Sequence, residues 1–151
     1  PLPFRVTWYD PRADVFPAHV PANVELRRLG DPADAMAKAG ADSFVLVMSH
    51  SHQLDQALIE AALADGRFPY VGLIGSATKR ARFEKRLAAV GIPRDRIDAL
   101  VCPIGVDGMH SKVPSVIAAA TTVQLLTRDE ALRAVGSGQS LSSPHRATRV
   151  G

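Results

Sequence analysis

The sequence has little cysteine, few aromatic residues and no long apolar run, and each shortage excludes a class of protein. Cys102 is the single cysteine among 151 residues, which excludes an internal disulfide and is typical of a reducing compartment such as the cytoplasm. No apolar run approaches the roughly 18 residues of a membrane span, and no secretory h-region is visible. Aromatic residues make up only 5% of the chain, too few for a set of platforms that stack single-stranded nucleic acid.

The chain also has only a small excess of positive over negative charge. The net charge is +3, and a content of 46% hydrophobic and 22% charged residues is ordinary for one globular domain. Only residues 79–86 are densely basic, and such a cluster is most often a solvated helix face. We therefore expect no nucleic acid partner. The sequence also lacks a Walker A motif, so ATP or GTP hydrolysis has no support.

Apolar patterns that fit strands alternate along the chain with patterns that fit helices. We expect strands at residues 4–10, 24–29, 43–49, 70–74 and 100–102. We expect helices at residues 32–39, around 54–62, from about 76 up to Gly91, at 114–126 and around 130–135. Residues 11–22 carry three prolines and should be irregular. The helix at 114–126 is apolar nearly all round, so we expect it to be largely buried.

This alternation predicts an α/β fold: a Rossmann-like, doubly wound and mostly parallel sheet formed by residues 1–135. Residues 136–151 have the composition of a linker and are expected to be a disordered tail. Because Pro1 cannot be an initiator residue, we expect the chain to be a fragment of a larger protein.

The most informative stretch is residues 70–80, YVGLIGSATKR, which fits a buried strand, a glycine turn and a helix start. Gly75 would let the backbone turn sharply and let a ligand approach closely. The free N–H groups of the helix start would then form an anion site, with Lys79 and Arg80 beside them. The alternative is an ordinary connection with solvated basic residues.

Parallel strands bring their carboxyl ends to one edge of a sheet, where open α/β sheets bind ligands. We predict that these turns form a cofactor site from Asp10, Arg12, His50, Ser51, His52, Gly75, Ser76, Thr78, Lys79, Arg80, Cys102 and Gly105. Asp10 fits a ribose or pterin contact or the start of a turn, and Arg12 fits a phosphate contact or a surface ion pair. Cys102 fits a small buried hydrophobe or a soft ligand for molybdenum. The histidines have no third and fourth zinc ligands nearby, and no hydrolase triad is present.

Residues 44–52 with Asp55, residues 70–83, residues 102–105 and residues 111–119 together resemble the XdhC/CoxI family of xanthine dehydrogenase accessory proteins. The resemblance extends over residues 2–127. It implies a protein that binds molybdenum cofactor, supports its sulfuration with a cysteine desulfurase, and inserts it into a xanthine dehydrogenase-type hydroxylase. It implies a cytoplasmic chaperone more than an enzyme. Whether the ligand is molybdopterin or its dinucleotide form stays open.

If the resemblance holds, the cofactor phosphate should lie at residues 75–79 beside an exposed Lys79. The molybdenum end should then point towards His50, His52 and Cys102, with Cys102 as the candidate metal contact.

The chain also departs from the family pattern. Family members carry an earlier strand followed by a Gly-x-Gly-His-Val-Gly turn, and neither is present here. That strand would lie between the strands that begin near Phe4 and Phe44, so its absence should leave two strands without a pairing partner and favour association into a homo-oligomer. Two alternative functions remain. One is an NAD(P)-binding oxidoreductase domain, and the other is an interaction module whose basic helix docks on an acidic partner.

Overall fold

The structure, a computed structural model, describes residues 2–137 and 146–151, and the chain divides into two compact units. The first unit is Pro1–Pro103 with His145–Gly151, and the second is Ile104–Pro144. The strands of the first unit are β1 (Arg5–Asp10), β2 (Val24–Arg28), β3 (Phe44–Val47), β4 (Tyr70–Leu73) and β5 (Arg146–Val150). Its helices are α1 (Pro32–Lys38), α2 (His52–Asp65), α3 (Ala77–Ala89) and α4 (Arg94–Asp98), with a short 3-10 helix at Ala13–Val15. The second unit contains α5 (Pro114–Gly136).

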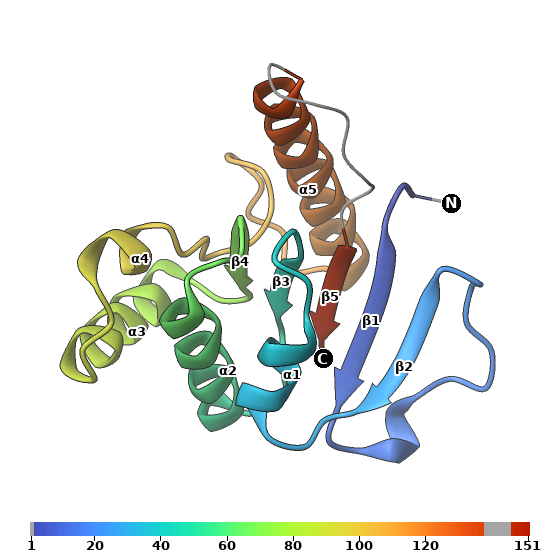
Figure 1. Cartoon of the computed structure of the whole chain (residues 1–151), viewed down its shortest axis with the longest axis horizontal. Helices are drawn as coiled ribbons and strands as arrows, with labels where there is room; N and C mark the ends of the chain where they lie inside the picture. The colour runs from blue at the N-terminus through green and yellow to red at the C-terminus, as the bar shows by residue number, and fades with distance from the viewer. Residues whose placement is uncertain (1, 138–145) are drawn as a thin grey trace. The chain divides into compact units, whose positions relative to one another are not determined.

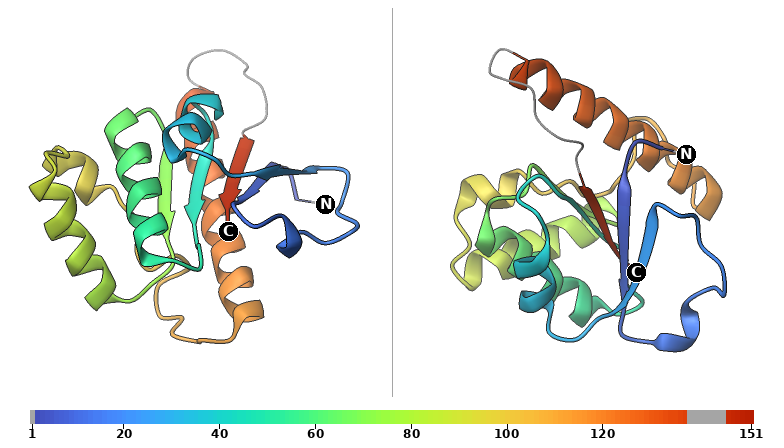
Figure 2. Two further views of the ribbon diagram at one scale, coloured as in Figure 1. Left: turned by 90° about the horizontal axis from the view of Figure 1, so that it is seen from below. Right: turned by 45° about the vertical axis from the view of Figure 1, so that its right-hand side comes forward.

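The five strands of the first unit form one parallel sheet in the order β2-β1-β5-β3-β4. Figures 1 and 2 show β5, the last strand of the chain, between β1 and β3. Thr148 of β5 lies beside Thr7 of β1 on one side and Val45 of β3 on the other. The prediction of an α/β, Rossmann-like and mostly parallel sheet is confirmed.

The position of β5 corrects two expectations. The gap predicted between β1 and β3 is filled, so neither strand lacks a pairing partner. The predicted disordered tail is wrong at both ends, since Gly136 closes α5 and residues 146–150 form the central strand. Residues 138–145 of that tail lie outside the described part of the chain. With the sheet completed, a missing strand no longer argues for a homo-oligomer.

Helices α1, α2 and α3 pack on the same face of the sheet, because each follows a crossover in the same direction and such crossovers are right-handed (Figure 1). One continuous core joins them to the strands. Leu58 and Ile59 of α2 and Val45 and Val47 of β3 are fully buried in it. Burial of one such side chain contributes about 1.5–3 kcal/mol, so this layer holds the helices against the sheet.

The ends of these helices follow the local sequence. Asp31 caps α1 by accepting a hydrogen bond of 2.8 Å from the backbone N–H of Ala33, and Pro32 begins the helix, as predicted. Gly91 follows α3 with a φ of +88°, a conformation that suits glycine at a helix end. The strand predicted at residues 100–102 is reduced to one bridge between Val101 and Gly72, and α4 was not predicted.

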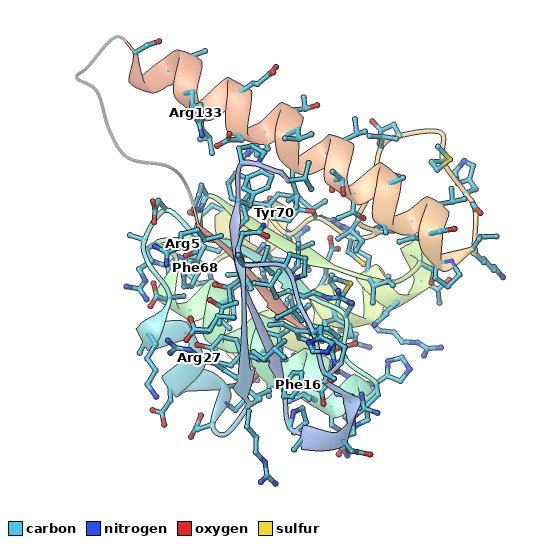
Figure 3. All side chains as sticks on the ribbon, turned by 90° about the vertical axis from the view of Figure 1, so that its right-hand side faces the viewer. Arg5, Phe16, Arg27, Phe68, Tyr70 and Arg133 are labelled. Atoms are coloured by element: carbon cyan, nitrogen blue, oxygen red, sulfur yellow. The ribbon has the colours of Figure 1, made fainter. Side chains whose placement is uncertain are left out.

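The connection between β1 and β2 is irregular, as the prolines predicted. Phe16 lies in this connection (Figure 3), and its ring lies edge-on to that of Trp8 with the ring centroids 5.6 Å apart. This contact ties the connection to the middle of β1.

In the second unit, the two predicted helices are one continuous helix, α5. No glycine or proline separates them, and an ion pair of 2.9 Å between Arg133 and Asp129 crosses one turn of the helix. The burial predicted for residues 114–126 was overestimated, because Val123 is 53% exposed. No helix in the described part of the chain has the combined length and apolar character that crossing a membrane requires.

Candidate functional site

The candidate site is the edge of the sheet at which β1, β5, β3 and β4 end. Backbone hydrogen bonds continue the sheet past the strands, from Met48 N–H to Val150 O at 3.1 Å and from Gly151 N–H to Tyr9 O at 2.8 Å. The chain crosses from β1 outward to β2 in one direction and from β3 to β4 in the other. The order therefore reverses around β5, and open α/β sheets bind ligands outside the carboxyl ends of strands at such a point.

Asp10, the last residue of β1, holds Arg12 at this edge. Asp10 is 1% exposed, whereas the side chain of Arg12 is 45% exposed. One carboxylate oxygen, Oδ1, accepts from the backbone N–H of Arg12 at 2.9 Å and from Nε at 3.1 Å, and Oδ2 accepts from Nη2 at 3.2 Å. The structure thus buries a carboxylate and uses it to fix an exposed guanidinium.

Burial acts to raise the pKa of Asp10, but the side-chain and backbone hydrogen bonds from Arg12 outweigh it, and the charges of Arg12 and His50 act in the same direction. The resulting pKa lies below the ordinary value for an aspartate.

The lowered pKa of Asp10 predicts a loss of stability in acid. A carboxyl whose pKa is lower in the folded state stabilises the fold above its unfolded pKa, about 3.9, and that contribution is lost as the pH falls through the folded value. Asp10→Asn should therefore flatten the fall in free energy of unfolding below about pH 5, measured by urea titration at several pH values. The exposed Asp14→Asn is the charge-matched control. Equal slopes in both variants would contradict the prediction.

The turn after β3 carries the two predicted histidines and the cap of α2. Ser51 caps the helix, because its Oγ accepts from the N–H of Leu54 at 3.3 Å. His50 and His52 are exposed on either side of Ser51. This turn therefore places two imidazoles and a helix start with free N–H groups at the edge of the sheet.

Asp55, which was not predicted as a site residue, organises this turn from beneath. It is 2% exposed, and its Oδ1 accepts from the N–H of Ser49 at 2.9 Å and from Ser49 Oγ at 2.7 Å. Its Oδ2 accepts from Lys79 Nζ at 2.8 Å. Asp55 thereby ties the turn after β3 to the start of α3.

Lys79 does not have the predicted environment. Its side chain is only 15% exposed, and Nζ donates to Asp55 and, at 2.8 Å, to Ile74 O. It also lies 5.5 Å from the ring centroid of Phe83. The expectation of an exposed lysine is therefore wrong, because a buried carboxylate 24 residues earlier in the chain draws the ammonium inward.

The inward position of Lys79 also explains why residue 75 is a glycine. A Cβ atom built on Gly75 would lie 2.5 Å from Lys79 Cδ, so glycine leaves room here for the lysine stem. Ser76 caps α3 by accepting from the N–H of Lys79 at 3.2 Å. Ser76 and Thr78 are exposed, and the first N–H groups of α3 have no partner within the helix. The helix start remains a candidate anion site, without the charge of Lys79 pointing into it.

The side chains of Arg80 and Cys102 are also directed into the protein. Nη1 of Arg80 donates to Leu100 O at 2.5 Å and to Cys102 O at 3.4 Å, and Nε pairs with Glu84 at 2.8 Å. Cys102 is 6% exposed, its Sγ lies 4.0 Å from Ser76 O, and burial raises the pKa of the thiol. Because metals bind the thiolate, this environment does not favour Cys102 as a molybdenum ligand. Residues 2–137 and 146–151 contain no cluster of three or more His, Cys, Asp or Glu that could hold a metal ion.

Gly105 belongs to the second unit, where the side-chain amide of Gln124 forms hydrogen bonds with both its N–H and its carbonyl. Its N–H donates to Gln124 Oε1 at 3.1 Å, and Gln124 Nε2 donates to its carbonyl at 2.6 Å. Its φ of +112° is one that side chains rarely adopt, which explains a glycine at this position.

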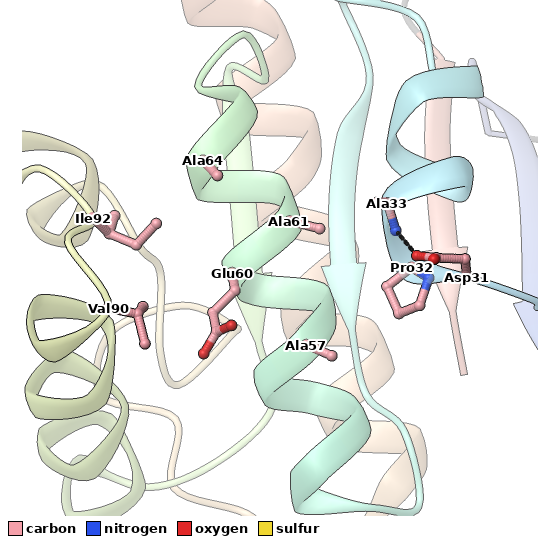
Figure 4. Close-up of a pocket in the computed structure, with 9 residues that line it drawn as sticks. All are labelled: Asp31, Pro32, Ala33, Ala57, Glu60, Ala61, Ala64, Val90 and Ile92. Atoms are coloured by element: carbon pink, nitrogen blue, oxygen red, sulfur yellow. Dashed lines mark hydrogen bonds between the residues drawn. The ribbon is translucent and has the colours of Figure 1, made fainter.

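A pocket of about 410 Å³ lies elsewhere in the first unit, on the outer face of α2 (Figure 4). Its floor is formed by alanines of α2, and Val90, Ile92 and the first residues of α1 form its sides. Glu60 and Asp31 are its only charged residues, and none of the predicted site residues lines it. The chemistry of the site is therefore at the sheet edge.

The fold defines a Rossmann-type domain, with a candidate ligand site at this edge of the sheet. A family model described as the XdhC Rossmann domain matches residues 1–125, so the chain belongs to the XdhC Rossmann domain family. This confirms the family that the motifs indicated.

A solved structure, described as a xanthine dehydrogenase from Bacillus halodurans, is similar to the chain at 25% sequence identity with a TM-score of 0.71. The similarity covers 91% of this chain and 40% of that one, so the chain spans less than half the length of this relative. None of the curated proteins matches the chain.

Proposed function

We propose that this domain binds molybdenum cofactor at the carboxyl edge of its sheet and acts as an accessory factor for a xanthine dehydrogenase-type hydroxylase. The observation that carries the proposal is the set of hydrogen-bond donors that gathers at this edge in a member of the XdhC family. The starts of α2 and α3 both present free N–H groups there, and Arg12 presents a fixed guanidinium. All three suit an anionic organic cofactor.

The residues present fit the phosphate end of the cofactor better than its metal end. The helix start at Ser76 and Thr78 would hold the anion, and Arg12, His50 and His52 would face the rest of the ligand as hydrogen-bond partners. Bound cofactor would supply the molybdenum centre, which this domain stores and presents. Asp55 and Lys79 would keep the two turns in position.

In this proposal the domain works in the cytoplasm as a chaperone and not as a turnover enzyme. It would hold the cofactor while a cysteine desulfurase supplies the sulfido ligand, and it would then deliver the cofactor to the hydroxylase. The XdhC family match and the likeness to the Bacillus halodurans protein support this assignment.

The test is retention of the cofactor by the chain under anaerobic gel filtration. Thr78→Asp should reduce retention about tenfold or more, because it places a negative charge against the anion site and removes a charge-assisted contact of roughly 1.5–3 kcal/mol. An acidic residue in the first turn suits the helix dipole, so the variant should stay folded.

Ala88→Asp, exposed at the far end of the same helix, is the matched control and should retain the cofactor. Absence of retention by the unmodified chain would sink the proposal. Equal retention by both variants would move the phosphate away from α3.

The alternative of an NAD(P)-binding domain has a specific observation against it. In such domains an acidic residue at the end of the second strand binds the ribose hydroxyls. In this chain β5 takes the place of the first strand and β1 that of the second, so the corresponding residue is Asp10. Asp10 is 1% exposed and accepts three hydrogen bonds from Arg12. Calorimetry with NAD and NADP would decide, and micromolar binding would favour the alternative.

A further inference from the structure

The pocket on the outer face of α2 has an apolar floor and an acidic lining. Its floor is formed by three alanines that share one side of the helix, Ala57, Ala61 and Ala64 (Figure 4). Its charged residues are Asp31 and Glu60, and Glu60 Oε1 accepts a hydrogen bond of 2.6 Å from the neutral amide of Gln56. Neither carboxylate forms an ion pair with a cation in the part of the chain that the structure describes. Two uncompensated negative charges therefore lie at an apolar hollow of about 410 Å³.

A basic ridge on α3, formed by Arg82, Lys85 and Arg86, begins beside this pocket. Val90 lines the pocket and caps α3, and its N–H donates to Arg86 O at 3.1 Å in the pattern of a continuing helix. Arg86 and Arg82 precede Val90 by four and eight residues, so they extend from the pocket along the same side of α3. All three cations of the ridge are exposed, and none has an ion-pair partner within residues 2–137 and 146–151.

An exposed apolar side chain joins the ridge to the pocket. Val90 is 58% exposed, the largest exposed fraction among the large apolar side chains that the structure describes in the first unit. A charged helix face alone is usually just solvated, and a single exposed valine needs no explanation. Here, however, unpaired cations and unpaired carboxylates lie on either side of the same apolar patch. Such a surface is complementary in charge to a second copy of itself, whereas any other partner would need both an acidic groove and a basic ridge of its own.

We propose that a second copy of this chain docks on this surface, with the basic ridge of each copy in the acidic pocket of the other. A two-fold axis forms the contact twice, because the same patch faces itself. Arg86 of each copy would then meet Glu60 of the other, and Val90 would be buried between them. This inference goes beyond the proposed function, since none of the candidate ligand-site residues lines the pocket. It also gives a homo-oligomer a basis that does not depend on a missing strand.

The test is the mass of the whole chain in solution, measured by light scattering after gel filtration. The unmodified chain should be a dimer at about 100 µM and dissociate on dilution, as a small and charged interface does. Arg86→Glu and Glu60→Lys should each weaken association about 100-fold or more, because two-fold symmetry turns one reversed charge into two like-charge contacts. Arg5→Glu is the matched control: it reverses the charge of an exposed arginine outside the three helices and should leave the dimer unchanged.

A mixture of the two variants distinguishes lost pairing from lost folding. Equal amounts of the Arg86→Glu chain and the Glu60→Lys chain should form a heterodimer, because both contacts between them again join opposite charges. Two monomeric variants that associate only with each other must both be folded. The interface would be overturned by an unmodified chain that is a monomer at about 100 µM. Variants that dimerise as the Arg5→Glu control does, or a mixture that stays monomeric, would overturn it equally.

These outcomes are independent of the proposed function. Neither variant changes a residue of the candidate ligand site, so both should retain molybdenum cofactor as the unmodified chain does. Retention of the cofactor by a chain that stays monomeric would overturn the interface alone. A dimer that depends on Arg86 and Glu60, in a chain that does not retain the cofactor, would support the interface and overturn only the proposed function.

Discussion

Lys79→Met is expected to destabilise the protein by about 3–5 kcal/mol, because it leaves the buried Asp55 carboxylate without its cation. Lys79 and Asp55 are 15% and 2% exposed at their side chains, and Nζ lies 2.8 Å from Oδ2. Methionine keeps most of the apolar stem that passes over Gly75, so the loss is chiefly electrostatic. The free energy of unfolding in urea is the measurement.

Two controls isolate the ion pair. Lys85→Met changes an exposed lysine on the same helix and should alter the free energy of unfolding by no more than about 0.5 kcal/mol. The double variant Asp55→Asn, Lys79→Met removes both charges and should recover much of the loss, since a neutral pair can cost little. If Lys79→Met were as mild as Lys85→Met, the inward position of Lys79 would be wrong.

The sequence predicted which edge of the sheet carries the candidate site, but it did not predict whether the side chains there point into solvent or into the protein. Apolar runs followed by glycine, serine and charged residues identified the turns after β1, β3 and β4. The caps at Ser51 and Ser76 were not predicted, although serine is a residue type that commonly caps helices. Whether a lysine in the first turn meets solvent depends on what lies beneath it, and Asp55 comes from another helix.

The sequence did not predict the central strand, β5, for a related reason. A buried parallel strand usually reads as a continuous apolar run, as β3 does with FVLV, whereas β5 reads RATRV. Arg149 in β5 places its guanidinium over the ring of Trp8, 4.6 Å from the centroid, and partial burial lowers its pKa. This contact lets a polar segment occupy a central position, and only the tertiary structure reveals it.

Deletion of residues 146–151 is expected to abolish cooperative unfolding of the sheet unit. β5 pairs with β1 on one side and β3 on the other, so its removal divides the sheet and leaves two open edges. Val150 is fully buried and Ala147 and Thr148 are nearly so, and these contacts disappear as well. Two-stranded remnants are marginally stable at best. Urea unfolding monitored by Trp8 fluorescence and by circular dichroism should lose its single transition.

Complementation tests whether the loss comes from the strand itself. A synthetic peptide with the sequence of residues 144–151 should restore the transition when added to the shortened chain, because the slot between β1 and β3 needs only a parallel strand with its backbone groups free. A scrambled peptide of the same composition should not, since β5 buries Ala147, Thr148 and Val150 and stacks Arg149 on Trp8. A shortened chain that unfolds with the midpoint and m-value of the complete one would show that residues 146–150 are not the central strand.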